Sequence, residues 1–453
     1  MAFVLRFVDK DGFIKERFFY LYHVQDTSSM TLKNAISEIL SHHCLDIQNI
    51  RGQGYDGASN MRGEWNGLQA LFLNECHCAY YVHCFAHRLQ LALIAVSKEV
   101  SSIYQFFQNL NFIINIITAS SKRHDQFQAT QISEFEHLQA IGELKTDTGS
   151  NQIGALKRAS DTRWGSHFYS ICSLQRGYNE SCSEIMGITE ILCQALQQKS
   201  QDILNAIQLV SSTKELIQEL RDDGWKRILE SVVNFSKLYE IDIPDLDAQY
   251  IEGRGRQQHD QITIEHHYHF DIFNSTIDFQ LQELDRRFTE QTMELLSLSS
   301  SLDPKNGYKA FNVDDICSLA EKYYPLDFSE QERISLNFQL KHFHKDIPKN
   351  PELQNLSSIS ELCQGLAKTG KSISYHLVDK LISLILTLPV STASSERAFS
   401  AMKIVKTRLR NKMEDDFLAN NLVVYIEREI AKIFTTDSIL EDFVNLKERR
   451  IQF

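Results

Sequence analysis

The chain has 453 residues, of which 43% are hydrophobic, with 47 basic and 59 acidic side chains and a formal net charge of −12. This composition supplies a large apolar core and excludes an intrinsically disordered chain, which combines low hydrophobicity with high net charge. The length allows two or three domains, because single cores stop growing at about 250–300 residues. The acidic balance also predicts that any contact with nucleic acid uses a local basic patch.

Membrane insertion and secretion are both disfavoured by the sequence. The apolar run at 381–388 is interrupted by Ser383 and Thr387, and it is far shorter than the ~20 residues of a spanning helix. The segment 1–12 carries charged residues where a signal peptide needs an unbroken apolar stretch. The nine cysteines lack a framework spacing, so we expect reduced thiols in an intracellular compartment.

The first hundred residues predict alternating strands and helices, which is typical of an α/β sheet. Aromatic and branched residues on both sides of the turn signal Asp11-Gly12 predict a β-hairpin. In chain order, the predicted elements are hairpin strands at 3–7 and 13–22, a helix at 31–42, a strand at 47–55, a helix capped by Ser59 that carries Leu68, Leu71 and Phe72, a strand at 79–82 and a helix through 89–96.

From about residue 101 onward the pattern becomes almost purely helical, with apolar residues repeating at three- and four-residue steps. Polar segments at 146–151 and 245–261 predict loops within this helical region. The last hundred residues contain the apolar run at 381–388, followed by predicted helices at 394–410 and 415–434. We therefore expect an α/β plus all-α architecture.

The first candidate for chemistry is Asp56, in the segment RGQGYDGASNM. It follows a predicted strand, which is where open α/β sheets place their active sites, and its carboxylate suits a hard cation such as Mg²⁺. The alternative is a turn aspartate that only connects the strand to the next helix.

The second candidate is Glu396, in the first turn of the predicted helix at 394–410. A carboxylate there also stabilises the helix through its dipole, so a structural role explains it equally well. The same helix carries a basic stripe, Lys403, Lys406 and Arg410. In an acidic chain this stripe indicates phosphate contact, and the alternative is a solvated face.

Thiols, imidazoles and a tryptophan supply three further candidates. Cys84 and His87 have the spacing of a ligand pair, but the nearby cysteines and histidines do not complete a usual four-ligand zinc site. The histidines at 259–269 are interpreted as a surface tract beside a mobile loop. Trp164, beside Arg163, could stack on an unpaired base, and the alternative is a core tryptophan.

The order of these motifs is more specific than any one of them. The blocks RGQGYDGASNM, HCFAHRLQL, TRWGSH and STASSERAFSAMKIVKTRLRNKM follow one another along the chain. In this order they resemble the hAT superfamily of DNA transposases, in particular the transposon-derived proteins that share a transposase body with MYM-type and TTF-type zinc-finger proteins. The resemblance covers essentially the whole chain, and the SSERAFS block with its basic tail looks like the hAT C-terminal dimerisation region.

The resemblance implies a ribonuclease-H-like core interrupted by a long helical insertion domain. On this basis we expect the N-terminal part of the core at 1–100 and the helical insertion at 101–350. The C-terminal part of the core, with the dimerisation region, is expected at 351–453. A nuclear protein without a membrane segment and without a small-molecule substrate is also implied.

The resemblance implies roles for single residues as well. Active hAT transposases use three carboxylates to hold two divalent metals that activate water or a 3′ hydroxyl. By motif, Asp56 matches the second acid and Glu396 the third, so these two would bind Mg²⁺ or Mn²⁺ in an active enzyme. Cys84 and His87 match a motif beside the active site, and Trp164 matches an insertion-domain tryptophan that stacks on a flipped base.

The first acid of the family has no match in this sequence. In the family it precedes a hairpin that resembles residues 1–18, and Asp9 and Asp11 lie in the hairpin turn instead. An N-terminal zinc finger of the BED or TTF type is also not found. Because two carboxylates would bind two metals poorly, we expect that this chain alone is not a working transposase.

The leading hypothesis is a domesticated or decayed hAT transposase body that forms a homodimer and retains nucleic-acid binding. The alternatives are an active metal-dependent transposase or nuclease, and a helical interaction scaffold without a DNA role. The dimer prediction rests on the family resemblance and on an apolar face of the last predicted helix, and the alternative is that this face packs internally. The residues of this face are Leu418, Leu422, Tyr425 and Ile430.

Overall fold

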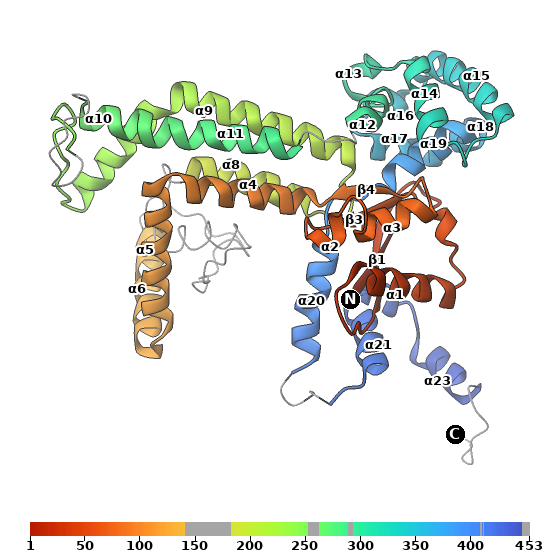
Figure 1. Cartoon of the computed structure of the whole chain (residues 1–453), viewed down its shortest axis with the longest axis horizontal. Helices are drawn as coiled ribbons and strands as arrows, with labels where there is room; N and C mark the ends of the chain where they lie inside the picture. Colours follow the sequence, from red (N-terminus) through yellow and green to blue (C-terminus); the bar gives the residue numbers. More distant parts are fainter. Residues whose placement is uncertain (141–182, 252–261, 289–292, 408–409, 411, 446–453) are drawn as a thin grey trace. The chain divides into compact units, whose positions relative to one another are not determined.

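The computed structural model describes residues 1–140, 183–251, 262–288, 293–407, 410 and 412–445. Two compact units alternate along the chain (Figure 1). Unit 1 comprises Met1–Ala86, Leu196–Ala206 and Thr292–Phe453, and unit 2 comprises His87–Ala195 and Ile207–Gln291. Within the described ranges, no helix is both long enough and apolar enough to span a bilayer.

The predicted hairpin is confirmed at the start of unit 1. Strands β1 (Ala2–Val8) and β2 (Ile14–Leu21) pair in antiparallel register. In the turn, the Asp9 carboxylate accepts hydrogen bonds from the backbone N–H of Asp11 at 3.1 Å and of Phe13 at 2.9 Å. Gly12 has φ +82°, and a Cβ there would lie 2.7 Å from the Cys363 backbone, so only glycine fits this turn.

The second strand pair differs in length from the prediction. Only Gly52–Tyr55 forms strand β3, because the Asp46 carboxylate caps a short 3₁₀ turn, η1 (Ile47–Asn49), by accepting from the Gln48 N–H at 2.9 Å. The predicted strand over 47–55 is therefore wrong in its first half. Strand β4 (Tyr80–His83) runs parallel to β3, as the alternation of strands and helices suggests.

Two helices replace the single one predicted after Asp56. The predicted cap at Ser59 is wrong, because Ser59 is the first residue of helix α2 (Ser59–Arg62), and Leu68 begins a separate helix, α3 (Leu68–Glu75). The turn between them needs glycine, since a Cβ on Gly67 would lie 2.3 Å from the Gly63 nitrogen. The predicted helix at 31–42 is confirmed as α1 (Ser29–His42), and it packs against α3 around Leu32, Ile36, Leu40, Leu68 and Phe72.

The rest of unit 1 is helical. The apolar run at 381–388 lies mostly in helix α19, where Leu381, Ile382 and Ile385 are fully buried. Helices before residue 350, which the sequence pattern groups with the middle segment, pack in this unit. The elements are α12 (Met293–Ser300), α13 (Lys305–Tyr308), α14 (Val313–Tyr323), α15 (Glu330–Asp346), η3 (Ile347–Lys349), α16 (Pro351–Gln354), α17 (Ile359–Lys368), α18 (Lys371–Ser374), α19 (His376–Leu386), α20 (Ala393–Val405), α21 (Asp415–Ile426), α22 (Arg428–Ala431) and α23 (Thr436–Asn445).

The two predicted C-terminal helices are shorter than expected. Helix α20 ends at Val405, where Lys406 leaves the helical region with φ −91° and ψ 81°. The predicted helix at 415–434 is interrupted at Glu427, which separates α21 from α22. The Glu427 carboxylate is buried, accepts from the Phe18 N–H at 2.8 Å and pairs with Arg17 at 2.8 Å. This tertiary contact with β2 explains why the helix breaks there.

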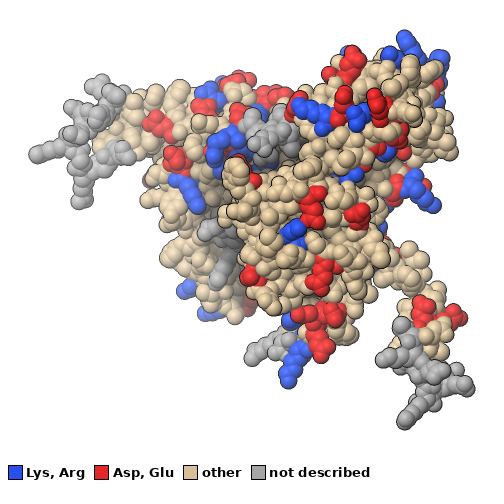
Figure 2. Space-filling view, turned by 45° about the vertical axis from the view of Figure 1, so that its right-hand side comes forward, with Lys and Arg blue, Asp and Glu red and all other residues tan. Residues whose placement is uncertain are grey.

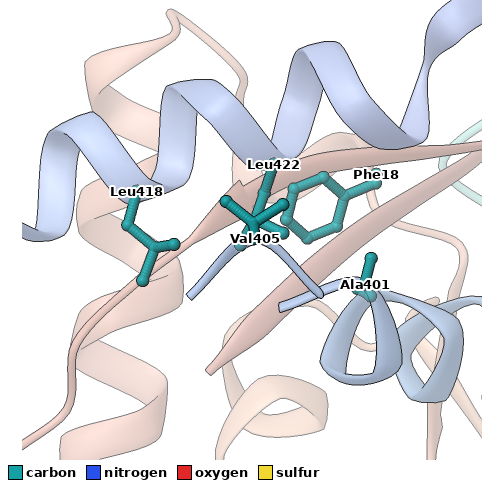
Figure 3. Packing of buried hydrophobic residues seen from close by; sticks show 6 residues of the cluster. Phe18, Ala401, Val405, Leu418 and Leu422 are labelled. Carbon is teal, nitrogen blue, oxygen red and sulfur yellow. The ribbon is translucent and has the colours of Figure 1, made fainter. Parts of the chain in front are cut away.

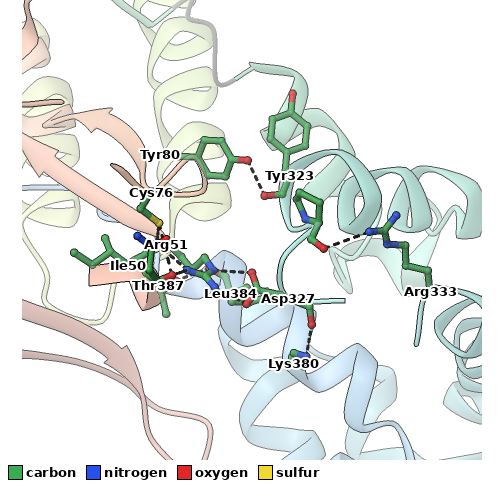
Figure 4. Close-up of polar contacts among 12 residues, drawn as sticks. Ile50, Arg51, Cys76, Tyr80, Tyr323, Asp327, Arg333, Lys380, Leu384 and Thr387 are labelled. Carbon is green, nitrogen blue, oxygen red and sulfur yellow. Dashed lines mark hydrogen bonds and ion pairs between the residues drawn. The ribbon is translucent and has the colours of Figure 1, made fainter. Parts of the chain in front are cut away.

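An ion pair joins the β3 region to the helices of the same unit (Figure 4). The Arg51 guanidinium donates to both carboxylate oxygens of Asp327, at 2.6 and 2.8 Å, and both side chains are nearly buried. The pair raises the pKa of Arg51. The Tyr80 hydroxyl donates to the Tyr323 carbonyl at 2.6 Å, so β4 is tied to the end of α14 as well.

The described part of unit 2 is mainly helical, with an irregular segment at 239–251 and an isolated antiparallel bridge between Gln249 and Thr263. Its elements are α4 (Phe85–Glu99), α5 (Ser101–Thr118), α6 (Ser121–Ala140), α8 (Ser183–Leu196), α9 (Ile203–Leu238), α10 (Ile264–His266), the π-helix η2 (His267–Asn274) and α11 (Ser275–Phe288). The helix predicted through 89–96 is confirmed as part of α4, and the helical character of the middle segment is confirmed where it is described.

The histidine group does not form a loose surface tract. His267 stacks on Tyr250 with ring centroids 3.7 Å apart, and His269 stacks on Trp225 at 4.6 Å. Burial lowers the pKa of His269. This expectation is therefore corrected: the histidines from 266 onward belong to a folded aromatic cluster, while His259 lies outside the described residues.

Candidate functional site

Asp56 lies at the carboxyl end of β3, as predicted. Strand β3 sits close to the chain segment before α20, since Cβ atoms on Gly52 and Gly54 would lie 2.7 and 2.8 Å from the Pro389 ring. The Asp56 side chain is exposed, and it accepts from the Ala58 N–H at 3.2 Å, as in an Asx turn. This geometry fits the turn-aspartate interpretation.

Cys84 connects the end of β4 to the start of α20. Its buried sulfur accepts from the Thr392 backbone N–H at 3.2 Å and from the Thr392 hydroxyl at 3.3 Å. The Phe85 N–H donates to the Val390 carbonyl at 2.9 Å. Residues more than 300 positions apart in sequence therefore meet at the same end of the β3–β4 pair.

The SSERAFS block divides into structural and exposed residues. The buried Ser394 hydroxyl donates to the Glu16 carboxylate at 2.5 Å, and Arg397 donates to the Gln197 carbonyl. Glu396, on the first turn of α20, is exposed. The block thus anchors α20 to the hairpin and to the Leu196–Ala206 segment, while its glutamate stays at the surface.

The contact at Ser394 belongs to a buried polar group that the sequence analysis did not identify. Arg6 pairs with Glu16 at 2.8 Å and donates to the carbonyls of Leu386 and Gln201, at 3.0 and 2.6 Å. Burial raises the pKa of the neighbouring Asp202. Arg6 and Glu16 face one another across the hairpin, so its register would have revealed this opposite-charge pair.

A two-metal centre is not assembled by the described residues. Asp56 and Glu396 are the carboxylates that the motifs select, and both are exposed. Among the described residues, no three His, Cys, Asp or Glu side chains come together in a way that could hold a metal ion. The donor set therefore does not fit the three-carboxylate arrangement, and we derive no catalytic step through a metal.

The other predicted site residues are His87, Arg163 and Trp164. His87 is half-buried in the first turns of α4, at the beginning of unit 2. Arg163 and Trp164 lie outside the described residues, so their proposed contact with a base stays a prediction.

The basic residues after Glu396 are exposed but do not share one helix. Lys403 is in the last turn of α20, Lys406 is its C-terminal cap, and Arg410 lies beyond it. The single basic stripe expected from the sequence is therefore corrected, because the helix ends before Arg410. On the face seen in Figure 2, acidic and basic side chains are interspersed rather than segregated.

Two of the predicted dimerisation residues belong to the core of this chain (Figure 3). Leu418 and Leu422 are 2% and 0% exposed, and they pack with Phe18, Ala398, Ala401 and Val405 between the hairpin, α20 and α21. A second chain could reach them only by opening this cluster. The expectation is thus corrected for these two leucines, which stabilise the fold of unit 1.

The opposite side of α21 and α22 is exposed and apolar. Phe417 and Val424 are 61% and 60% exposed, and Ile430 on α22 is 38% exposed. Phe417 and Val424 are seven positions apart, so they lie on one side of α21. This outer face, defined as Phe417, Val424 and Ile430, is exposed apolar surface that a partner can contact.

Comparison with known proteins gives matches at both ends of the chain. Residues 1–67 match the family described as ZMYM1/FAM200, RNase-like domain, and residues 354–430 match the hAT family C-terminal dimerisation region. The second match includes α20, α21 and α22, and therefore the outer face.

Two curated relatives, from Mus musculus and Homo sapiens, are both named 52 kDa repressor of the inhibitor of the protein kinase. Each is 20% identical over 94% of this chain, and the aligned part covers 60% of the mouse protein and 59% of the human protein. The chain thus spans about three-fifths of the length of these relatives. The chain is thus similar to an RNase-like domain at its start and to the hAT C-terminal dimerisation region near its end, and along most of its length to these two relatives.

Proposed function

We propose that this chain acts as a domesticated hAT transposase body that forms a homodimer through its C-terminal region and has no catalytic activity. The exposed outer face within the matched dimerisation region carries the dimer proposal. An apolar surface that is not used inside its own chain favours association, because its burial removes apolar area from water.

The proposed architecture is a ribonuclease-H-like core with a helical insertion. It is supported by the RNase-like match at 1–67, by the parallel β3–β4 pair and by the way that unit 1 is assembled from three separate segments. The relatives are named repressors, and by analogy we propose a regulatory role in the nucleus.

Light scattering at micromolar concentration tests the dimer. We expect the mass of a dimer for the native chain, and a monomer for the double variant Phe417→Asp/Val424→Asp, since charge on the outer face opposes its burial. Ile373→Asp is the matched control, because Ile373 is 82% exposed on α18, outside the outer face. A native chain that is monomeric would overturn the proposal.

The absence of catalysis is tested separately. The proposal is supported by two exposed carboxylates that the described residues do not complete into a metal site. We expect no Mn²⁺-dependent strand cleavage of hairpin or duplex DNA by the purified chain. Cleavage that is lost in Asp56→Asn or Glu396→Gln would establish the alternative, an active transposase or nuclease.

Nucleic-acid binding is a second candidate function. It is favoured by the exposure of Lys403, Lys406 and Arg410 in a chain of net charge −12. If these residues contact phosphates, reversing all three should flatten the dependence of log affinity on log salt by roughly 0.9 per lost contact. Unchanged or undetectable binding would favour a protein-interaction scaffold instead.

A further inference from the structure

The C-terminal region contains a groove with an apolar floor and a cationic rim. The groove has a volume of about 430 Å³ and lies between the end of α20, α21 and α22. Its lining includes the apolar side chains Val405, Val424 and Tyr425 and the cations Arg410, Arg428 and Lys432. No carboxylate is among its lining residues.

The cations of this groove are available to an acidic ligand. The Arg428 guanidinium lies 4.3 Å from the centre of the Tyr425 ring and donates to the Tyr425 carbonyl at 3.1 Å, so it is held over the floor. None of the ion pairs formed within the described parts of the chain involves Arg410, Arg428 or Lys432. The groove therefore suits a segment that is apolar on one side and acidic at its edges.

Helix α23 has this pattern. It has no buried residue, and Ile439, Leu440 and Val444 are 56%, 46% and 46% exposed. At 100° per residue these side chains share one side of the helix, and its three acidic residues flank that side. The acidic residues are Asp437, Glu441 and Asp442, and the helix TDSILEDFVN contains no basic residue. In Figure 2, the lobe beside the grey C-terminal residues is correspondingly red and not blue.

We propose that helix α23 of a second copy of this chain docks into the groove formed by α20, α21 and α22. The proposal rests on the dimer of the proposed function and names the segment that makes the contact. The family match ends at residue 430, so α23 lies beyond the matched dimerisation region.

The structure favours a second copy over the same chain. None of the groove-lining residues belongs to α23, and no residue of α23 is buried, so this helix does not occupy the groove of its own chain. Because each copy has one groove and one helix α23, the helix of each copy can dock into the groove of the other. Two such contacts form a closed dimer with two-fold symmetry.

Charge reversal in full-length chains tests the docking. One variant, groove-reversed, carries Arg428→Glu and Lys432→Glu. The other, helix-reversed, carries Asp437→Lys, Glu441→Lys and Asp442→Lys. In a dimer of either variant alone, the groove and the helix that meet carry charges of the same sign. We therefore expect the dimer dissociation constant to rise at least about tenfold. In an equimolar mixture both contacts between unlike copies have opposite signs, and we expect heterodimers of nearly native affinity.

The outcomes separate the inference from the proposed function. If the native chain dimerises and both variants dimerise equally well, the α23 contact is wrong while the dimer stands. If both variants are weakened and the mixture does not recover, the exchange between copies is overturned. If the native chain is a monomer, the proposed function fails. Far-ultraviolet circular dichroism of each variant verifies that it is folded, and the recovery in the mixture could not come from misfolded chains.

Discussion

Two regions of unit 1 use their charged residues in opposite ways. In the interior, Arg6 pairs with Glu16 across the hairpin, and Arg51 pairs with Asp327, which is 276 positions away in the sequence. At the carboxyl end of β3, Asp56 is exposed, as is Glu396 on α20, although both belong to the most recognisable motifs. The comparison teaches that neighbouring residues of one motif can differ in their surroundings: Ser394 and Arg397 bond to other segments of unit 1, while Glu396 between them is exposed.

The largest effect is expected from the interior of the C-terminal region. Leu422→Ala removes a fully buried side chain from the cluster around Phe18 and should lower the free energy of unfolding by about 2–5 kcal/mol. Urea denaturation measures this change. Asn420→Ala, two positions away and exposed on the other side of α21, is the control and should change stability by less than about 0.5 kcal/mol. If both variants lost the same free energy of unfolding, α21 would not have one buried side and one exposed side.

The next effect concerns the pair that ties β3 to the helices. Asp327→Ala leaves the Arg51 guanidinium nearly buried without its carboxylate, and we expect a loss of about 3 kcal/mol of unfolding free energy. Glu294→Ala removes a carboxylate that pairs with Lys322 while both side chains are 56% exposed, and this control should change the free energy of unfolding far less. If Asp327→Ala lost as little unfolding free energy as Glu294→Ala, the interior ion pair would stabilise the protein no more than the surface pair.

A smaller effect is expected at the break between α21 and α22. Glu427→Gln keeps the size of the side chain but weakens its bonds to the Phe18 N–H and to Arg17, which should cost about 1.5–3 kcal/mol. Thermal unfolding followed by circular dichroism measures this loss. Glu429→Gln, two positions away and exposed, is the matched control. A variant as stable as the native chain would mean that the contact with β2 does not hold the break.

The smallest effect is expected at the motif acids. Asp56→Asn and Glu396→Gln should change the free energy of unfolding by no more than about 0.5 kcal/mol, since both side chains are exposed. Chemical denaturation of the two variants, alone and combined, measures this. A large gain in stability would be informative, because removal of a carboxylate from a repulsive acidic cluster stabilises a protein. That result would indicate that these carboxylates lie closer to other acidic side chains than their exposed positions suggest.

Local patterns were sufficient for the elements that depend on local chemistry. The hairpin follows from alternation around Asp11-Gly12, and α1 follows from apolar spacing. The carboxyl-end position of Asp56 follows from the order of strand and turn. The break at Glu427 could not be predicted in this way, because its carboxylate bonds to a strand more than 400 residues earlier.

In the sequence alone, the order of the motifs indicated a resemblance to hAT transposases, and short-range periodicity indicated where most helices lie. Only the tertiary structure decided which side of each helix is buried and which other elements of the chain cover it. Leu418, Leu422 and Val424 are all apolar residues of α21, yet the two leucines face the hairpin and Val424 lines an open groove. The physical reason is that burial depends on the neighbours that a fold brings together, and those neighbours come from distant parts of the chain.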